Sequence, residues 1–411
     1  MLSKEGLKNN ILSIFLFLFV IMSSGYMLQV CEGKMQTFIQ YFDIFIFMVM
    51  FIYHFIFQNK FRHCNKSQSI CLLFILSYLL SMLINSEKIN IYLSQFSIIF
   101  CAFFIVEYCD SKKIIKVFIN GMFIISLISL FFMGYIFFFG APNTELVNTS
   151  LSNYGYYNYY IFFYPNLWST NLARNSGLFW EPGIFASYLI IALILEVTFS
   201  EKISYIKLII LILTTVTTFS TAGIIMIVPL LIILIGRTID NIKIKWIVSI
   251  ILIIITLYLL FNMNFILNQL YLFNSNIFGK IIDSDLITTS TRIGSPLLNI
   301  KIFKTNPLFG VGINGATDIY NSFKGMYRID SQTSTSTYML AVIGVFGITY
   351  TLIWIYSIIK IDLFSLTTKC LILILILFII NKEPHNSLMA TWLLFFLFYK
   401  IAQNKFNKYI N

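Results

Sequence analysis

The sequence predicts an all-α, polytopic membrane protein whose helices cross the bilayer about twelve times. The 411-residue chain is 58% hydrophobic and only 11% charged, whereas about a quarter of the residues in a soluble protein are charged. Apolar runs of roughly 17–25 residues, the length that crosses a bilayer, recur from end to end. The alternating pattern of an outer-membrane barrel is absent. Because no repeat or linker divides it, residues 1–411 are expected to form a single integral-membrane domain.

Each predicted span follows one apolar run. The spans cover about residues 11–30, 38–57, 70–86, 89–107, 114–140, 182–200, 204–219, 222–236, 246–262, 335–359, 367–381 and 388–402. The short runs on either side of Ser220–Gly223 also fit one long or re-entrant segment. Residues 11–30 are long for a signal-peptide core, and no clear cleavage site follows them, so no cleavable signal peptide is expected.

The distribution of positive charge predicts the orientation. Most of the 28 Lys and Arg residues fall on one side of the predicted membrane, and the short loops of the other side carry only Lys34, Lys88 and Lys382. The positive-inside rule therefore places both termini in the cytoplasm. The net charge of +11 reflects this topology and contact with anionic membrane lipids, and no nucleic-acid partner is expected.

Two long polar segments, at about 141–181 and 263–334, are predicted on the outer side. Loops of this length are often functional. The first contains a tyrosine-rich stretch that ends in Tyr159 and Tyr160. These side chains suit a membrane-interface belt, which is the favoured interpretation for most of them, or a surface on which sugars stack.

The second segment is expected to contain a helix over Ser290–Phe303. Ser290 or Thr291 would cap it, and Pro296 argues against a much earlier start. The apolar face would consist of Ile293, Leu297, Ile300 and Phe303. A glycine-dense loop follows at 306–315. It is similar to a phosphate-binding loop but lacks a nucleotide-binding fold, so a tight turn beside a lipid headgroup is the alternative.

Arg174 and Glu181 are the first candidate functional residues, because they lie at the mouth of the apolar run 182–200. Charges at such a position are often functional. The alternative is structural: Arg174 would be an interfacial anchor, and Glu181 would cap the helix together with Pro182. The nearby Gly177 and Gly183 favour a close-packed site.

Arg292, Arg328 and His385 are the next candidates. A guanidinium binds pyrophosphate through two parallel hydrogen bonds and keeps its charge, although a solvated loop charge paired with a nearby aspartate is the default interpretation of Arg328. His385 could act as a general base or bind pyrophosphate, or it could be an ordinary interfacial residue. The six cysteines are scattered and no Cys or His cluster has metal-ligand spacing, so no metal or other cofactor is expected.

Two motifs resemble the O-antigen polymerase and ligase family, the Wzy-type membrane enzymes of bacterial surface polysaccharide assembly. RNSGLFWEPGIFA at 174–186 is similar to a stretch of capsular and O-antigen polymerases. TRIG at 291–294, followed by NPLFGVG at 306–312, is similar to the family's second outer loop. Thr221 and Ala222 stand where family members often carry Ser-Arg-Gly. The ligase branch often has His-Asn before a Gly-containing helix, where this chain has 334–338, which favours the polymerase branch.

The resemblance implies a metal-independent glycosyltransferase of the bacterial cytoplasmic membrane. It would join undecaprenyl-pyrophosphate-linked repeat units into O-antigen or capsular polysaccharide, with a chain-length regulator as a further partner. Arg174 and Arg292 would stabilise the departing pyrophosphate, and Glu181 would take the acceptor proton or orient Arg174. The other implied site residues are His385 for catalysis and Arg328, Tyr159, Tyr160 and Trp180 for substrate binding.

Other functions remain open from the sequence. A ligase that transfers finished glycan shares the chemistry and the fold. A flippase for the same lipid-linked unit explains the spans but needs no long outer loops, and matched broken helices are not evident. An oligosaccharyltransferase-type enzyme would place an acidic pair in the first outer loop, which holds only Glu32. A non-catalytic scaffold is the remaining alternative.

Overall fold

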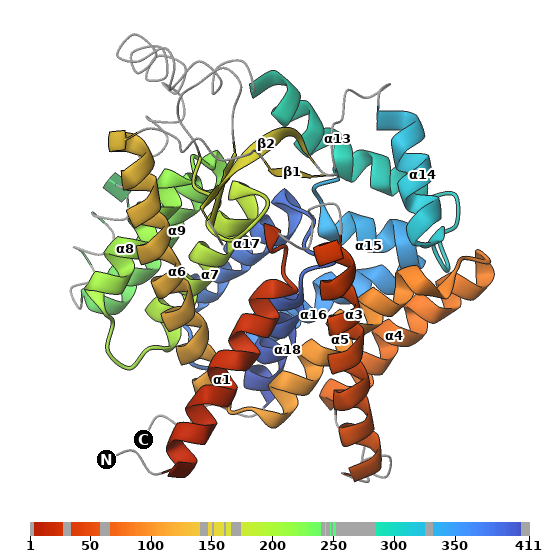
Figure 1. Ribbon diagram of the computed structural model, residues 1–411, viewed down its shortest axis with the longest axis horizontal. Helices are drawn as coiled ribbons and strands as arrows, with labels where there is room; N and C mark the ends of the chain where they lie inside the picture. The colour runs from red at the N-terminus through yellow and green to blue at the C-terminus, as the bar shows by residue number, and fades with distance from the viewer. Residues whose placement is uncertain are drawn as a thin grey trace.

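The fold is a bundle of tilted helices (Figure 1). The computed structural model describes residues 4–27, 34–57, 66–139, 147–149, 152–159, 162–165, 174–239, 285–324 and 332–403, with single positions at 243, 247, 250 and 251. Within these residues, seven helices are long and apolar enough to cross a membrane. The expected polytopic helical membrane protein is therefore confirmed, whereas twelve crossings remain a prediction.

Helices occupy every expected span except 246–262, most of which lies outside the described residues. They are α1 (Lys4–Met22), α3 (Lys34–Ile52), α4 (Lys66–Ile84), α5 (Ile89–Tyr108), α6 (Ser111–Phe139), α7 (Pro182–Phe199), α8 (Tyr205–Thr217), α9 (Thr221–Thr238), α15 (Thr335–Ile343), α16 (Ile348–Lys360), α17 (Leu366–Lys382) and α18 (Met389–Gln403). A π-helical turn, η1 (Tyr53–Phe57), extends α3, and a 3-10 turn, η3 (Gly344–Gly347), joins α15 to α16.

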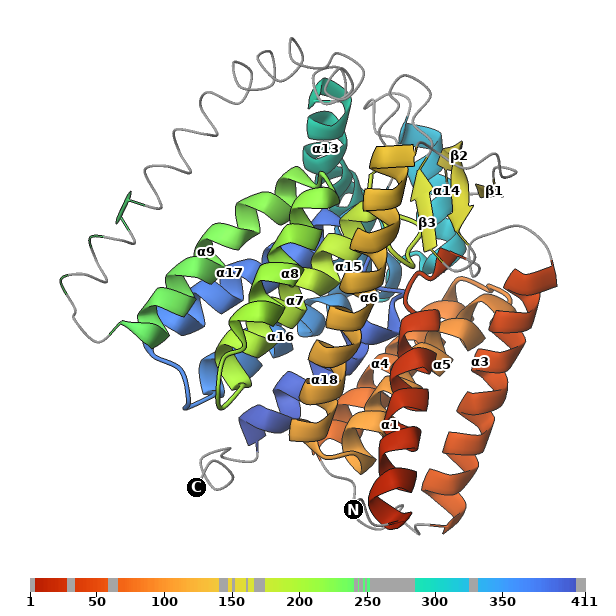
Figure 2. The ribbon, with the colours of Figure 1, turned by 60° about the vertical axis from the view of Figure 1, so that its left-hand side comes forward.

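The two ends of the bundle carry different elements (Figure 2). The start of α1 and the end of α18 lie at one end, which we call the terminal end. The opposite end, the loop end, carries helices α13 (Asp285–Phe303) and α14 (Gly312–Lys324) and strands β1 (Val147–Thr149), β2 (Ser152–Tyr159) and β3 (Phe162–Pro165). The described parts of the two long polar segments therefore lie at the end opposite the termini, whereas the cytoplasmic location of the termini remains a prediction.

Two helices form the centre of the bundle. Helix α7 is buried from Pro182 to Val197 and packs against α6, α8, α9 and α17. Helix α18 is buried from Met389 to Tyr399 and packs against α1, α4, α5 and α16. A helix that is apolar on all sides is stable only when other helices surround it. The N-terminal ends of both central helices reach the loop end.

Helices α8 and α9 are two separate helices rather than one long segment. The chain turns at Phe219, whose φ of 48° lies in the left-handed region. The Ser220 side chain then accepts a 3.3 Å hydrogen bond from the backbone N–H of Gly223 and caps α9. The start of α9 lies beside the first turns of α7, since a Cβ on Gly223 would lie 3.0 Å from the Cβ of Ala186.

The tyrosine-rich stretch of the first polar segment is a strand rather than an irregular loop. Strand β2 pairs antiparallel with β1 and with β3, and Tyr159 is opposite Phe162 in the β2–β3 register. Phe162 is 1% exposed, and its ring lies 5.7 Å from that of Phe132 in α6. This aromatic contact attaches the sheet to the bundle. The small sheet is the one departure from the all-α prediction within the described residues.

Helix α13 differs from its prediction in its start and in its buried face. It covers Asp285–Phe303, so it begins before Ser290 and contains Pro296. Leu297 is 62% exposed and Ile300 is 36% exposed, although both belong to the predicted apolar face. The buried positions are Ser295, Leu298, Asn299 and Ile302. The buried face of the helix therefore differs from the predicted apolar face, because Ser295 and Asn299 donate hydrogen bonds to Gln332 in the segment before α15.

The glycine-dense loop at 306–315 packs against the α15–α16 junction. A Cβ on Gly310 would lie 2.3 Å from the carbonyl oxygen of Val342, and a Cβ on Gly344 would lie 2.4 Å from that of Leu308. Both glycines have positive φ, 70° and 63°. Two backbone segments therefore touch where no side chain fits, which gives these glycines a structural role.

Candidate functional site

Arg174 is anchored at the turn between α8 and α9. Its Nε donates to the carbonyl oxygen of Thr218 at 3.0 Å, and its Nη2 donates to that of Phe219 at 3.4 Å. These carbonyls follow the C-terminal end of α8, where the helix dipole favours a cation. The side chain is half-buried. Because a guanidinium has more N–H groups than these two contacts use, Arg174 retains donors for another ligand.

Asn175 fixes the chain beside Arg174. Its backbone N–H donates to the carbonyl oxygen of Thr217 at 3.1 Å. Its side-chain amide donates to the hydroxyl groups of Ser129 at 3.2 Å and Thr217 at 3.0 Å, and its Oδ1 accepts from Gly177 at 3.0 Å. Asn175 is fully buried. Asn175 was not among the predicted site residues, and its place between two candidate charges, Arg174 and Glu181, is the signal that could have indicated it.

The segment that follows α1 lies against Trp180. Tyr26 and Phe179 form an isolated antiparallel bridge, and the backbone N–H of Trp180 donates to the carbonyl oxygen of Gly25 at 3.1 Å. A Cβ on Gly25 would lie 3.4 Å from the indole ring. Trp180 is half-buried. The segment from Arg174 to Glu181 is thus bound on one side to the α8–α9 turn and on the other to the residues that follow α1.

Glu181 occupies the N-cap position of α7, and Pro182 is the first helical residue, as the structural alternative predicted. The Glu181 carboxylate, however, makes no capping hydrogen bond to the helix. It is half-buried. The backbone of Glu181 therefore starts the helix without a cap from its carboxylate.

Lys382 and Glu383 bind the first turn of α7. Lys382 is 3% exposed, and its Nζ donates to the carbonyl oxygen of Gly183 at 2.9 Å. A Cβ on Gly183 would lie 2.2 Å from Oε1 of Glu383, so the absence of a side chain there makes room for this carboxylate. Glu181 and Glu383 therefore both lie at the start of α7. Neither Lys382 nor Glu383 was among the predicted site residues, although both are close neighbours of His385.

His385 is enclosed directly below this turn. It is 0% exposed. Its Nδ1 lies 2.8 Å from the hydroxyl of Thr391, and its Nε2 lies 3.3 Å from that of Ser187. Burial, with a smaller effect from the positive charge of Lys382, lowers the pKa of the imidazole from 6.5 to about 3. His385 is therefore neutral near pH 7.

A hydrogen-bond network joins α13 to the ends of α15 and α17. Gln332 accepts from Ser295 at 2.6 Å and from Asn299 at 3.0 Å. Asn381 accepts from the hydroxyl of Ser334 at 2.8 Å and directly precedes Lys382. The backbone of Arg292 lies one helical turn before Ser295, so α13 brings this predicted residue toward the same network.

Several predicted residues have no described side chain. Arg328 and Tyr160 lie outside the described residues. Arg292 and Tyr159 are described for their backbone only, in α13 and β2 respectively. The described part of the site therefore consists of Arg174, Trp180, Glu181 and His385 with their partners. The roles predicted for all of these residues remain predictions.

The helix after the glycine-dense loop binds a carboxylate of the protein itself. Oε1 of Glu87 accepts from the backbone N–H of Gly315 at 2.8 Å, and Oε2 accepts from that of Ile313 at 3.0 Å and from the Tyr92 hydroxyl at 2.6 Å. A Cβ on Gly312 would lie 2.4 Å from the same carboxylate. A helix N-terminus attracts an anion, and here Glu87 supplies it. This loop therefore resembles a phosphate-binding loop only in sequence.

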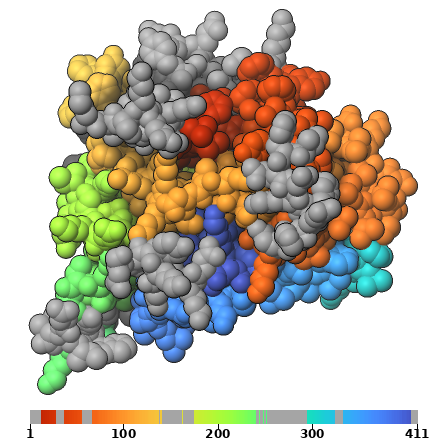
Figure 3. Space-filling model, turned by 90° about the horizontal axis from the view of Figure 1, so that it is seen from below, coloured from red at the N-terminus to blue at the C-terminus, as the bar shows by residue number. Residues whose placement is uncertain are grey.

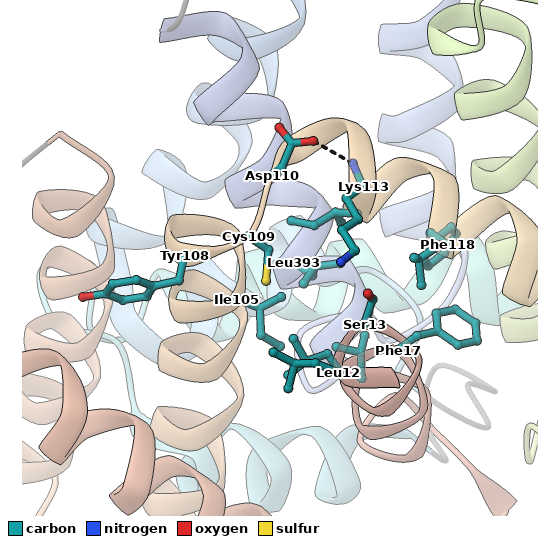
Figure 4. Close-up of a pocket in the computed structure, with 14 residues that line it drawn as sticks. Leu12, Ser13, Phe17, Ile105, Tyr108, Cys109, Asp110, Lys113, Phe118 and Leu393 are labelled. Atoms are coloured by element: carbon teal, nitrogen blue, oxygen red, sulfur yellow. Dashed lines mark hydrogen bonds between the residues drawn. The ribbon is translucent and has the colours of Figure 1, made fainter. Parts of the chain in front are cut away.

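Two cavities open at the terminal end, away from this cluster. The smaller, of about 270 Å³, lies between α1, α5, α6 and α18, and its lining is mostly apolar, with Asp110 and Lys113 among its residues (Figure 4). The larger, of about 710 Å³, lies between α6, α7, α8 and α9. Neither cavity is lined by a predicted site residue.

Comparison with known proteins assigns no family to the chain. No protein-family model matches it, and no characterised protein is similar to it in sequence. The class of protein that the fold defines is a polytopic helical membrane protein with a polar, partly buried cluster of charged residues at its loop end.

Proposed function

We propose that the chain is a membrane glycosyltransferase that joins polyprenyl-pyrophosphate-linked oligosaccharide repeat units in the bacterial cytoplasmic membrane. One observation carries the proposal: charged side chains lie at both ends of one short segment, with Arg174 bound to the α8–α9 turn and Lys382 and Glu383 against the first turn of α7. Such groups are rarely kept at the edge of an apolar bundle without a function. The resemblance of the 174–186 motif to Wzy-type polymerases gives this cluster its proposed chemistry.

Arg174 is the proposed pyrophosphate ligand. Two of its N–H groups are fixed on backbone carbonyls, so the guanidinium is held in place before substrate binds. The remaining donors can contact phosphate oxygens as negative charge develops on the leaving group. Arg292 would contribute a second cation from α13.

Glu181 is the proposed base, and Glu383 is the alternative carboxylate at the same helix end. In the reaction, an acceptor hydroxyl attacks the anomeric carbon of the donor sugar. The bond from that carbon to the pyrophosphate oxygen breaks, polyprenyl pyrophosphate leaves, and the hydroxyl proton passes to the carboxylate. The leaving group carries the displaced electron pair, so the step needs no redox partner.

His385 has a positioning role in this proposal. A general base must reach the substrate hydroxyl, whereas the His385 ring is enclosed and both its nitrogens face hydroxyl groups. Its backbone N–H also binds the Thr335 hydroxyl at 2.7 Å. The residue therefore holds the loop that presents Lys382 and Glu383 to α7.

The experiment is complementation of a strain that lacks the gene, with wild type, Arg174→Ala, Arg174→Lys or Glu181→Gln at matched protein levels. The length of lipid-linked and surface glycan is measured for each. We expect single repeat units in the deletion strain and in Arg174→Ala, partial polymer in Arg174→Lys, and shortened polymer in Glu181→Gln. Lys360→Ala, an exposed cation at the terminal end, should give wild-type length.

Other outcomes would favour other functions. If the deletion strain lacks even single-unit surface product and accumulates the lipid-linked unit, a flippase is favoured. If full-length polymer accumulates on the lipid carrier and is not transferred, a ligase is favoured. Polymer of wild-type length in Arg174→Ala would show that polymerisation does not need Arg174 and would contradict the proposed site.

A further inference from the structure

The larger cavity of the terminal end has no part in the proposed reaction. Its volume of about 710 Å³ falls within the range of roughly 300–1,000 Å³ that is typical of ligand pockets. It lies between the starts of α6 and α8, the ends of α7 and α9, and the α16–α17 turn. Figure 3 views the molecule from this end.

Basic side chains dominate the charged part of the cavity lining. They are Lys112, Lys116, Lys202, Lys207 and Arg237, against the carboxylates Glu196 and Glu201. Glu196 is 2% exposed and accepts hydrogen bonds from the Ser200 hydroxyl at 2.8 Å and the Ser204 backbone at 2.7 Å. This carboxylate is therefore used within the α7–α8 turn, and the cavity keeps an excess of positive charge.

Two of these cations, Lys207 and Arg237, are held by neutral oxygen atoms. Nζ of Lys207 donates to Oδ1 of Asn120 at 2.7 Å, and Arg237 donates to the carbonyl oxygens of Val197 and Ser200. Within the described residues, Lys116, Lys202, Lys207 and Arg237 form no ion pair. Their charges are thus positioned without being neutralised, which suits an anionic ligand.

The lining also has an apolar part. It includes Ile115, Ile119, Val197, Phe199, Ile233 and Leu363. Cationic groups beside an apolar wall, at the level where transmembrane helices end, match the two parts of a membrane lipid. Basic pockets between transmembrane helices bind anionic lipid headgroups in this way.

We propose that this cavity binds the phosphate group of an anionic membrane lipid, with Lys116 and Lys207 as its principal ligands and Arg237 as a fixed third cation. The headgroup lies among these three side chains, and the start of an acyl chain lies along Ile115 and Ile119. The site is distinct from the loop end and does not depend on the proposed glycosyltransferase activity.

The test is lipid binding to the purified full-length chain, measured by native mass spectrometry. The probes are phosphatidylglycerol, phosphatidylcholine with the same acyl chains, and millimolar inorganic phosphate as a competitor. Wild type should bind phosphatidylglycerol about tenfold more tightly than phosphatidylcholine, and phosphate should not displace it. Because each basic residue near a membrane contributes about a fivefold factor in binding, Lys116→Gln with Lys207→Gln should weaken this binding about 25-fold. Lys360→Gln should not change it.

A second variant tests the cavity without changing its charge. Gly236 lines the cavity, and a Cβ placed on it meets nothing within 4 Å. Gly236→Trp should therefore fill the cavity and reduce phosphatidylglycerol binding about tenfold, an effect of the size expected when a ligand group is excluded. Gly134→Trp is the matched control, because a Cβ at Gly134 also meets nothing within 4 Å and Gly134 does not line the cavity.

Three results would overturn the proposal. They are equal binding of both lipids by wild type, wild-type affinity in the double lysine variant and in Gly236→Trp, and displacement of lipid by inorganic phosphate. The last result would identify a site for a free phosphate rather than a lipid. Thermal unfolding of each variant without added lipid distinguishes lost binding from a lost fold.

Discussion

Nζ of Lys382 donates a 2.9 Å hydrogen bond to the carbonyl oxygen of Gly183, which joins the end of α17 to the first turn of α7. The next residue, Glu383, places its carboxylate in the space that the missing Gly183 side chain leaves. The start of the central helix is therefore fixed by two consecutive, oppositely charged residues from a distant part of the sequence.

Lys382→Met should lower the free energy of unfolding by about 2 kcal/mol. A hydrogen bond that involves a charged group contributes about 1.5–3 kcal/mol, and Lys382 is almost completely buried. Thermal or denaturant unfolding in detergent measures the change. Lys88→Met, at an exposed lysine of the same end, should change the stability by less than about 0.5 kcal/mol. An equal effect of the two substitutions would contradict the assigned contact.

Gly183→Ala should reduce glycan polymerisation while the protein remains folded. The new Cβ would meet the end of the flexible Glu383 side chain, which can turn away at little cost, so the carboxylate moves and the backbone does not. Polymer length in a complemented deletion strain measures the effect. Gly236→Ala, where the new Cβ meets nothing, is the control. Wild-type polymer in Gly183→Ala would show that the position of Glu383 is unimportant.

Gly310→Ala and Gly344→Ala should each destabilise the protein by more than about 2 kcal/mol. In both cases the Cβ meets backbone atoms that cannot move freely, and the residue has a positive φ that disfavours any side chain. Gly134→Ala lies within α6 without a close neighbour and should instead stabilise by about 0.5–1 kcal/mol. The three midpoints of thermal unfolding, compared at one protein concentration, decide the prediction.

Glu87→Gln should loosen α14. The variant keeps the size of the side chain but removes the negative charge from the helix N-terminus, where an anion contributes about 0.5–2 kcal/mol. Limited proteolysis should cut within Gly312–Lys324 faster than in wild type. Glu201→Gln, which changes an exposed carboxylate at the terminal end, should leave this cleavage rate unchanged. Added phosphate should not restore the wild-type rate if Glu87 is the native ligand of the helix.

Because burial lowers the pKa of His385, we expect the protein to lose stability in acid. Its pKa falls from 6.5 to about 3 on folding, so the unfolded chain binds a proton more readily than the folded chain. Stability is therefore complete above about pH 6.5 and declines as the pH falls toward 3, by about 1.4 kcal/mol per pH unit. Unfolding measured at pH 7.5 and pH 5 should show a loss of about 2 kcal/mol in wild type. His385→Gln should show a smaller difference between the two pH values.

Much of the helical arrangement was predictable because it depends on local composition. A long apolar run in a chain with few charges forms a membrane helix wherever it lies, so α3–α9, α17 and α18 match their expected ranges closely. The expected span 335–359 is instead divided by η3 into α15 and α16. The start of α7 was equally clear from Glu181 and Pro182. The sheet β1–β3 was missed because its tyrosines suited several environments, and one contact of Phe162 with α6 fixes it to the bundle.

The candidate site was predictable in its residues but not in its connections. Arg174 and Glu181 attracted attention because charges are costly beside an apolar helix. No local pattern, however, indicated that Arg174 binds the α8–α9 turn or that Lys382 and Glu383 reach α7. Helix α13 shows the same limit: its apolar residues suggested one face, whereas Ser295 and Asn299 donate hydrogen bonds to Gln332 and lie on the face that is buried.

The positions of the helices and the residues that are costly to bury follow from local composition, because both depend on transfer of each side chain from water to an apolar environment. The partner of each polar group depends on the folded arrangement, because hydrogen bonds and close backbone contacts join residues that lie far apart in the chain. Glu87 gives the plainest case. It lies in a short turn without any distinctive pattern, yet it occupies the helix N-terminus of the one loop that looked able to bind phosphate.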